Sequence, residues 1–128
     1  MGLDMDFSEL EKLVSKLANP DPIARKMIQT TTNPLKRALK ARAPTESGEM
    51  KKSIRPSPIK NRGNGYFRIV RPTGKNSRGF RNMEIAAYYE FGNRSRRQPP
   101  RPFIASAVQE TKSECLQIMQ DVFDSEVI

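Results

Sequence analysis

Two segments near the ends of the chain repeat apolar residues every three to four positions, and this helical period restricts the fold most strongly. The segment at 104–122 carries the longer stripe, and the segment at 23–39 carries the second one. The stripe positions are Ile104, Val108, Thr111, Cys115, Ile118, Met119 and Val122, and Ile23, Met27, Ile28, Thr31, Leu35, Ala38 and Leu39. The sequence between them is interrupted by glycine and proline, so we expect helices at both ends and short strands in the middle.

The N-terminal part, residues 7–42, is predicted to be helical. A first helix over 7–18 would have Asp6 as its cap and an apolar face. That face comprises Phe7, Leu10, Leu13, Val14 and Leu17. A second helix would begin at Asp21 and Pro22 and end near Arg42. Pro34 lies inside it and predicts either a kinked helix or two helices that meet at Asn33–Pro34.

The middle part, residues 43–92, is predicted to hold the sheet. Ser47 can cap a short turn that contains Met50, and residues 54–60 and 66–71 form the two arms of a hairpin around Asn61–Gly65. In the second arm, Phe67 and Ile69 would face one side, and Tyr66, Arg68 and Val70 the other. Residues 83–91 fit a third strand or a strand that turns into a short helix.

These elements predict one α+β domain over residues 1–128. We expect a small antiparallel sheet of about three to four strands, packed against two or three helices, with a C-terminal helix over 102–125. Two long basic loops connect these parts. The first, within 72–82, is expected to be exposed and mobile and contains Lys75, Arg78 and Arg81. The second, 93–101, contains Arg94, Arg96, Arg97 and Arg101.

Charge is distributed unevenly along the chain. Residues 22–104 hold 20 Lys or Arg and four acids, whereas the two ends together hold three bases and ten acids. A basic middle with acidic ends predicts a molecule with distinct faces. Such a molecule can bind nucleic acid, an acidic protein, or copies of itself packed front to back.

The residue types argue against an enzyme. The chain has no histidine and one cysteine, Cys115, which excludes a Cys–His pair and a Cys/His zinc site. Glu46 with Glu49 and Glu84 with Glu90 are the remaining carboxylate pairs, and neither has metal-ligand spacing. We therefore expect no catalytic residue, no metal, no cofactor and no small-molecule substrate. Cys115 is interpreted as a buried structural thiol.

The stretch 86–93 combines aromatic residues with a neighbouring block of arginines. Tyr88, Tyr89 and Phe91 could stack on bases, but core packing or a protein interface is the favoured interpretation. Glu90 is interpreted as a structural ion pair or as a cap near Gly92. No apolar run reaches the length of a membrane span, and the acidic N-terminus lacks a secretory signal, so we expect a soluble intracellular protein without membrane contact.

Three segments together resemble a family of small neck and tail-completion proteins of long-tailed bacteriophages and prophages. Residues 43–54 are similar to its Ala-Pro, Thr/Ser-Gly, apolar, Ser-Ile signature, with Pro44, Gly48 and Ser53 at motif positions. Tyr89, Glu90, Phe91 and Gly92 are similar to its Glu-aromatic-Gly-Thr. Pro102, Phe103 and Ile104 with Ala107 are similar to the start of its last helix. Met50, Asn93 and Ser106 depart from the residues usual in the family.

The resemblance implies a helix-flanked antiparallel sheet and a subunit of a homo-oligomeric ring at the junction of head and tail. Gly48 and Gly92 would be backbone-shape positions. The place where the second basic loop, called the arginine loop below, leaves the fold would be fixed by Tyr89, Glu90, Phe91 and Phe103. We hypothesise a structural protein that joins head and tail, whose basic loops become ordered when they dock on neck and tail proteins. It would assemble in the host bacterial cytoplasm and end in the virion neck or tail. Contact with DNA in the channel remains compatible with this role, and the alternative function is sequence-independent nucleic-acid binding.

Overall fold

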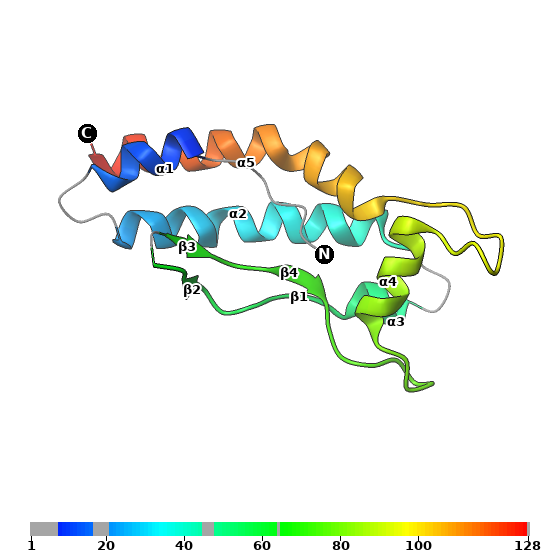
Figure 1. Cartoon of the computed structure of the whole chain (residues 1–128). Helices are drawn as coiled ribbons and strands as arrows, with labels where there is room; N and C mark the ends of the chain where they lie inside the picture. Colours follow the sequence, from blue (N-terminus) through cyan, green and yellow to red (C-terminus); the bar gives the residue numbers. More distant parts are fainter. Residues whose placement is uncertain (1–7, 17–20, 45–47, 64, 128) are drawn as a thin grey trace.

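Helix α2 (Asp21–Arg42) is the middle layer of the molecule, as Figure 1 shows. The computed structural model describes residues 8–16, 21–44, 48–63 and 65–127. On one side of α2 lies α5 (Phe103–Val127) together with α1 (Ser8–Ser15), and on the other lie four short strands. The strands are β1 (Ile54–Pro56), β2 (Lys60–Asn61), β3 (Tyr66–Phe67) and β4 (Val70–Pro72); α3 (Glu49–Lys52) and α4 (Asn82–Phe91) complete the elements of the described residues. The predicted α+β class is confirmed.

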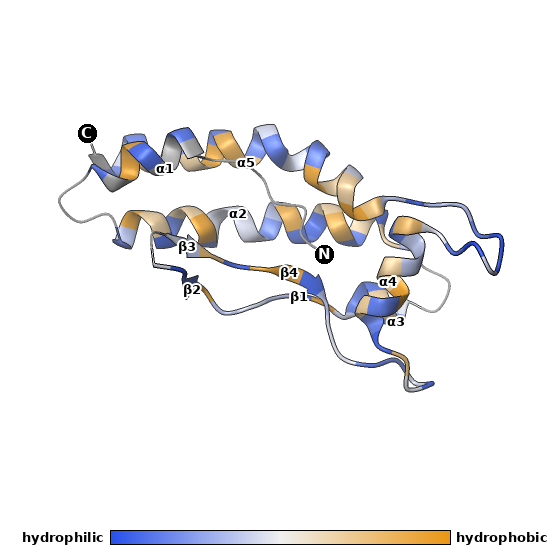
Figure 2. Cartoon of the chain, in the orientation of Figure 1, coloured by the Kyte–Doolittle hydropathy of each residue, from blue (hydrophilic) through white to orange (hydrophobic). Residues whose placement is uncertain are grey.

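The two long helices pack along the apolar stripes that the sequence predicts. At one end, Val14 of α1, Met27 of α2, and Met119 and Val122 of α5 form a buried cluster. Figure 2 shows hydrophobic and hydrophilic stretches alternating along both α2 and α5, as expected of amphipathic helices. Burial of these side chains stabilises the pair by about 1.5–3 kcal/mol for each large residue.

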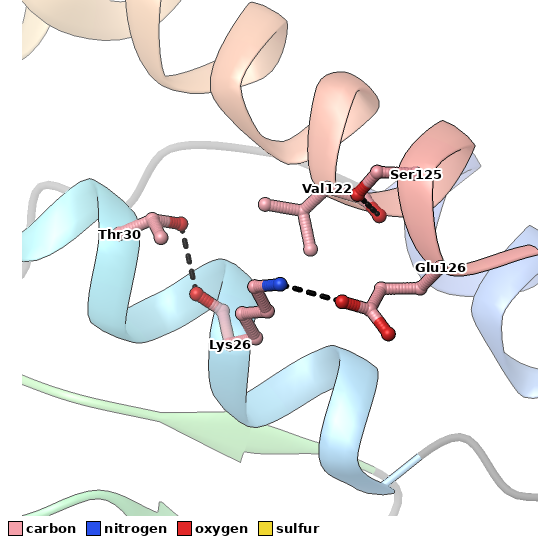
Figure 3. A network of polar contacts seen from close by, with 5 residues as sticks. All are labelled: Lys26, Thr30, Val122, Ser125 and Glu126. Atoms are coloured by element: carbon pink, nitrogen blue, oxygen red, sulfur yellow. Dashed lines mark hydrogen bonds and ion pairs between the residues drawn. The ribbon is translucent and has the colours of Figure 1, made fainter.

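A polar contact links α2 and α5 at the same end of the helix pair (Figure 3). Lys26 Nζ of α2 lies 2.5 Å from Glu126 Oε1 of α5, in the last turn of that helix. Both side chains are exposed, so the pair contributes at most about 1 kcal/mol to stability. Thr30 Oγ1 donates to the Lys26 carbonyl at 2.8 Å, and Ser125 Oγ donates to the Val122 carbonyl at 3.0 Å.

Helix α2 continues through Pro34, so the alternative of two separate helices is wrong. Proline removes one backbone hydrogen bond and normally disrupts a helix. Here Pro34 is buried, and α2 is packed on both sides, which compensates for the missing bond. Just before it, the hydroxyls of Thr31 and Thr32 donate to the carbonyls of Met27 and Ile28, at 2.9 and 2.7 Å.

The predicted hairpin is present, but it consists of two separate two-stranded antiparallel sheets instead of one sheet of three to four strands. β1 pairs with β4, with Pro56 opposite Val70, and β2 pairs with β3, with Lys60 opposite Phe67. The first arm therefore has one residue more than the second between these two pairs. Pro58 lies in this interval and has no N–H to donate, so a bulge interrupts the ladder there.

The two faces of the hairpin are as predicted. Val70 packs on the core, and Arg68 reaches α2, where its Nη1 donates to Thr32 Oγ1 at 3.1 Å. The Arg25 guanidinium of α2 lies 4.8 Å from the centre of the Tyr66 ring. Ile69, which points the other way, is 46% exposed.

Two other predictions are corrected by the structure. Residues 83–91 are not a strand; α4 is helical from Asn82 because Asn82, Ala86 and Glu90, four residues apart, are buried together on one helix face. Leu13 belongs to the predicted apolar face of the first helix, but it is 44% exposed.

The caps proposed at Asp6 and Ser47 lie outside the described residues, as does the predicted extension of the first helix to positions 7, 17 and 18. In the structure, Gly48 occupies the N-cap position of α3 with φ +76°. The predicted role of Gly48 in backbone shape therefore agrees with the geometry, because this region of φ favours glycine.

Candidate functional site

The two basic loops lie at opposite ends of α4, and α4 fixes the distance between them (Figure 1). The loop at 73–81 leads into the first turn of α4, and the loop at 92–102 leaves its last turn and enters α5. A helix of ten residues spans about 15 Å. The residues predicted to bind partners are therefore brought to the same end of the molecule, on either side of one short helix.

Glu90 joins α4 to the start of α5. Its side chain is 4% exposed, and its two carboxylate oxygens accept hydrogen bonds from the backbone N–H groups of Ile104 at 2.8 Å and Ala105 at 3.0 Å. The first N–H groups of a helix have no partner within the helix, and the helix dipole favours an anion there. Of the two roles predicted for Glu90, an ion pair or a cap near Gly92, the structure shows a cap. It caps the start of α5, however, and not the end of its own helix near Gly92.

Gly92 makes the turn at which the arginine loop leaves α4. Its φ is +77°, and a Cβ atom at this position would lie 2.8 Å from the Gln98 carbonyl oxygen and 2.9 Å from the Pro100 nitrogen. Any side chain would therefore push the returning strand of the loop away. The predicted backbone-shape role of Gly92 agrees with this geometry.

Backbone hydrogen bonds close the base of the arginine loop. Asn93 and Gln98 exchange two N–H···O bonds of 2.9 Å, and the Arg101 N–H donates to the Tyr89 carbonyl at 2.5 Å. The side chains of Arg94, Arg96, Arg97 and Arg101 are all exposed. Figure 2 shows this loop as the most continuous hydrophilic segment at this end of the molecule.

The other basic loop is also held by hydrogen bonds. Lys75 and Arg81 form an isolated antiparallel bridge, and the Asn76 side-chain oxygen accepts from the Arg78 and Phe80 N–H groups at 3.0 Å each. The Glu49 carboxylate of α3 accepts from the Ser77 N–H at 3.0 Å. The predicted exposure of Lys75, Arg78 and Arg81 is confirmed. Its mobility stays a prediction, although these bonds indicate a preformed turn.

The outer face of α4 carries exposed aromatic residues between the two loops. Glu84, Tyr88 and Phe91 share this face because they are spaced by four and three residues. Tyr88 is 53% exposed and Phe91 is 64% exposed, whereas Tyr89 packs against the core. The expectation that Phe91 fixes the exit of the loop is therefore wrong. Tyr89, Glu90 and the buried Phe103 make the contacts that hold the loop base and the start of α5.

The first motif segment builds the corner beneath α4. Pro44 is buried, and the Ser53 hydroxyl donates to the Met50 carbonyl at 2.6 Å. The Ser53 carbonyl in turn accepts from the Thr73 hydroxyl at 2.7 Å.

The third motif segment begins α5. Pro102 is exposed, and its carbonyl accepts from the Ser106 N–H at 3.0 Å in the first turn of α5.

The carboxylates of the described residues do not gather into one site. No group of three or more Cys, Asp or Glu side chains that could hold a metal ion occurs among them. Glu84 is exposed and Glu90 is buried, so the two do not share a site, and Glu46 lies outside the described residues. A hollow of about 420 Å³ between α3, the 73–81 loop and α4 has Glu49 as the one acid among the described residues that line it.

Cys115 is buried on α5, as predicted. Burial raises the pKa of its thiol above the ordinary value, and the neighbouring Glu114 charge adds to this effect. None of the helices in the described part of the chain combines the length and hydropathy that crossing a membrane requires.

Comparison with known proteins gives one family match. The model of the HK97-gp10-like family, described as "Bacteriophage HK97-gp10, putative tail-component", matches residues 8–92. The match includes α1 to α4 and two of the three motif segments, and it ends at Gly92, where the arginine loop begins. Neither the curated proteins nor the solved structures gave a match. Since the matched region is well over half of the sequence, the chain belongs to the HK97-gp10-like family of bacteriophage tail components.

Proposed function

We propose that this tail component is a structural, non-enzymatic subunit that joins head and tail as part of a tail-completion ring. The observation that supports it most directly is the pair of closed basic loops held at the two ends of α4 at one end of the molecule. Exposed arginines on preformed turns can bind carboxylates of neighbouring proteins without a large ordering cost. The subunit would assemble in the host cytoplasm and remain in the neck or tail of the virion.

The partners would be neck and tail proteins with acidic surfaces. Exposed Tyr88 and Phe91 lie between the basic loops, and aromatic residues and arginine are the types enriched in protein interfaces. Such a surface combines apolar contact at its centre with charge at its rim.

The test is the variant Arg94→Ala, Arg96→Ala, Arg97→Ala. All three side chains are exposed, so the variant should fold with the stability of the parent within about 0.5 kcal/mol for each change. Heads and tails should accumulate unjoined in cells that carry this variant, as seen by electron microscopy. A variant with Lys12→Ala, Lys16→Ala and Lys112→Ala removes the same charge from exposed sites elsewhere and should support joining. Full infectivity of the triple-arginine variant would refute the proposal.

Sequence-independent nucleic-acid binding is the second candidate. Between Glu49 and Glu84 the chain has ten Lys or Arg residues and no acid, which favours a polyanionic partner. A binder that contacts several phosphates should lose about a hundredfold or more in affinity when salt rises from about 50 to 200 mM. Absence of DNA binding at low salt would eliminate this candidate.

A further inference from the structure

The outer faces of the two layers that cover α2 carry opposite charge. The hairpin, on one side, presents the ribbon face, which we define as Arg55, Lys60, Arg62, Phe67, Ile69 and Arg71. Helix α5, on the other side, contains five acids and one lysine. We define its acidic stripe as Glu114, Gln117, Asp121 and Asp124. Because α2 separates the two layers, the ribbon face and α5 lie on opposite sides of the molecule (Figure 1).

The ribbon face places two arginines side by side. Arg55 and Arg71 are directly opposite each other in the β1–β4 pair, and their neighbours Ile54 and Pro72 are buried, so both arginines point away from α2. Like charges in this arrangement repel and destabilise an isolated sheet. The ion pairs found in the described residues do not include either arginine. An external anionic surface would relieve this repulsion.

Apolar side chains share the ribbon face. Ile69 is 46% exposed between the two sheets, and the Arg62 guanidinium lies 4.6 Å from the centre of the Phe67 ring. A phosphate backbone makes no use of an exposed isoleucine, whereas apolar centres with charged rims are typical of contacts between proteins. These residues favour a protein as the partner over nucleic acid.

The acidic stripe is similar to the ribbon face in length, and its residues also lie on one exposed face. Its four residues are three, four and three positions apart, so they lie on one face of α5, and all four are exposed. The buried residues Thr111, Cys115 and Val122 occupy the side turned to α2. From Glu114 to Asp124 the stripe spans about 15 Å. From Arg55 to Lys60 the ribbon face spans about 17 Å at a strand rise of about 3.3 Å.

We propose that the ribbon face of one copy binds the acidic stripe on α5 of a second copy. The surfaces differ, so the contact is heterologous, and each copy keeps one free face to which a further copy can bind. Guanidinium groups suit this role because their fork matches a carboxylate. The proposal deepens the proposed function, on whose assembly role it rests, by naming the surfaces through which the subunits contact each other. The basic loops on α4 remain available to other proteins.

Two neutralised variants of the full chain test it. Arg55→Gln with Arg71→Gln removes two of the four charges of the ribbon face, and Glu114→Gln with Asp121→Gln removes two of the three charges of the stripe. At low ionic strength the parent should self-associate with increasing concentration in sedimentation velocity, and salt should weaken the association because exposed charges are screened. Each variant alone should associate about tenfold more weakly.

The mixture of the two variants gives the sharpest result. Each variant retains one intact face, and the two intact faces are complementary. An equimolar mixture should therefore form heterodimers that do not grow further. The control variant Arg37→Gln with Lys112→Gln removes two exposed charges from α2 and α5 outside both faces and should associate like the parent.

Three outcomes would overturn the proposal. The first is a parent protein that stays monomeric and gives no zero-length crosslink between Lys60 and the acids of the stripe. The second is unchanged association of both variants. The third is loss of DNA binding, without loss of self-association, in the Arg55/Arg71 variant, which would assign the ribbon face to nucleic acid. The Arg94/Arg96/Arg97 variant should self-associate normally, so failure of the proposed function can be told apart from failure of this contact.

Discussion

The contact between Glu90 and the start of α5 makes a quantitative prediction for the variant Glu90→Ala. The carboxylate is buried and accepts two backbone hydrogen bonds, of 2.8 and 3.0 Å, from Ile104 and Ala105. A hydrogen bond to a charged group contributes about 1.5–3 kcal/mol, and loss of the acceptor leaves both donors at a helix end without a protein partner. We expect Glu90→Ala to lower the free energy of unfolding by about 3–5 kcal/mol, a large part of the about 5–15 kcal/mol of a typical domain.

Urea denaturation of the purified protein measures this change, and two further variants calibrate it. Glu90→Gln keeps the size of the side chain and one oxygen acceptor but loses the charge, so it should cost about 1–3 kcal/mol. Glu84→Ala removes an exposed carboxylate from the same helix and should stay within about 0.5 kcal/mol of the parent. Amide exchange should become faster at Ile104 and Ala105 in Glu90→Ala, because their N–H groups lose their acceptor.

A small effect would contradict this account of the loop base. If Glu90→Ala and Glu84→Ala destabilised the protein equally, the carboxylate would not connect α4 to α5. The same conclusion would follow if exchange at Ile104 and Ala105 were unchanged while the overall stability fell.

Two further predictions concern other positions. Gly92→Ala should destabilise the protein by about 1–3 kcal/mol, because it combines φ +77° with a Cβ only 2.8 Å from the Gln98 oxygen, whereas Gly65→Ala, which meets no atom within 4 Å, should cost less than about 1 kcal/mol in the same denaturation assay. For Cys115, the pKa is raised in the folded state, so its contribution to stability is fully present below the ordinary thiol value of 9.0 and is lost as the pH rises through the folded pKa. Denaturation of the parent and of Cys115→Ala at a series of alkaline pH values should show a steeper loss of stability for the parent; parallel curves would contradict the prediction.

The long helices could be predicted because their sequences repeat apolar residues with the period of the structure. α2 and α5 bury residues such as Met27, Leu39 and Met119 on one stripe, and the predicted ends of both helices are close to the observed ones. The faces of the hairpin followed from the same logic with a period of two.

α4 could not be assigned because its buried face is partly polar. Asn82 and Glu90 are buried, while Tyr88 and Phe91 are exposed, so hydropathy does not follow the helical period. The burial of Glu90 depends on two N–H groups 14 and 15 residues further along the chain, and no local pattern contains that information. The bulge near Pro58 likewise depends on the register of the opposite arm.

The family match includes residues that position the arginine loop, but it ends before the loop itself. The match ends at Gly92 and so includes the carboxylate of Glu90 and the turn at Gly92, both of which determine where the loop begins. The four loop arginines and the N–H groups that Glu90 binds lie beyond it. The contacts at the loop base are mostly backbone bonds, which constrain the exposed loop side chains very little. The side chains of Arg94, Arg96 and Arg97 can therefore change without disturbing the base, and under the proposed docking role we expect the loop to carry the features that are particular to this protein.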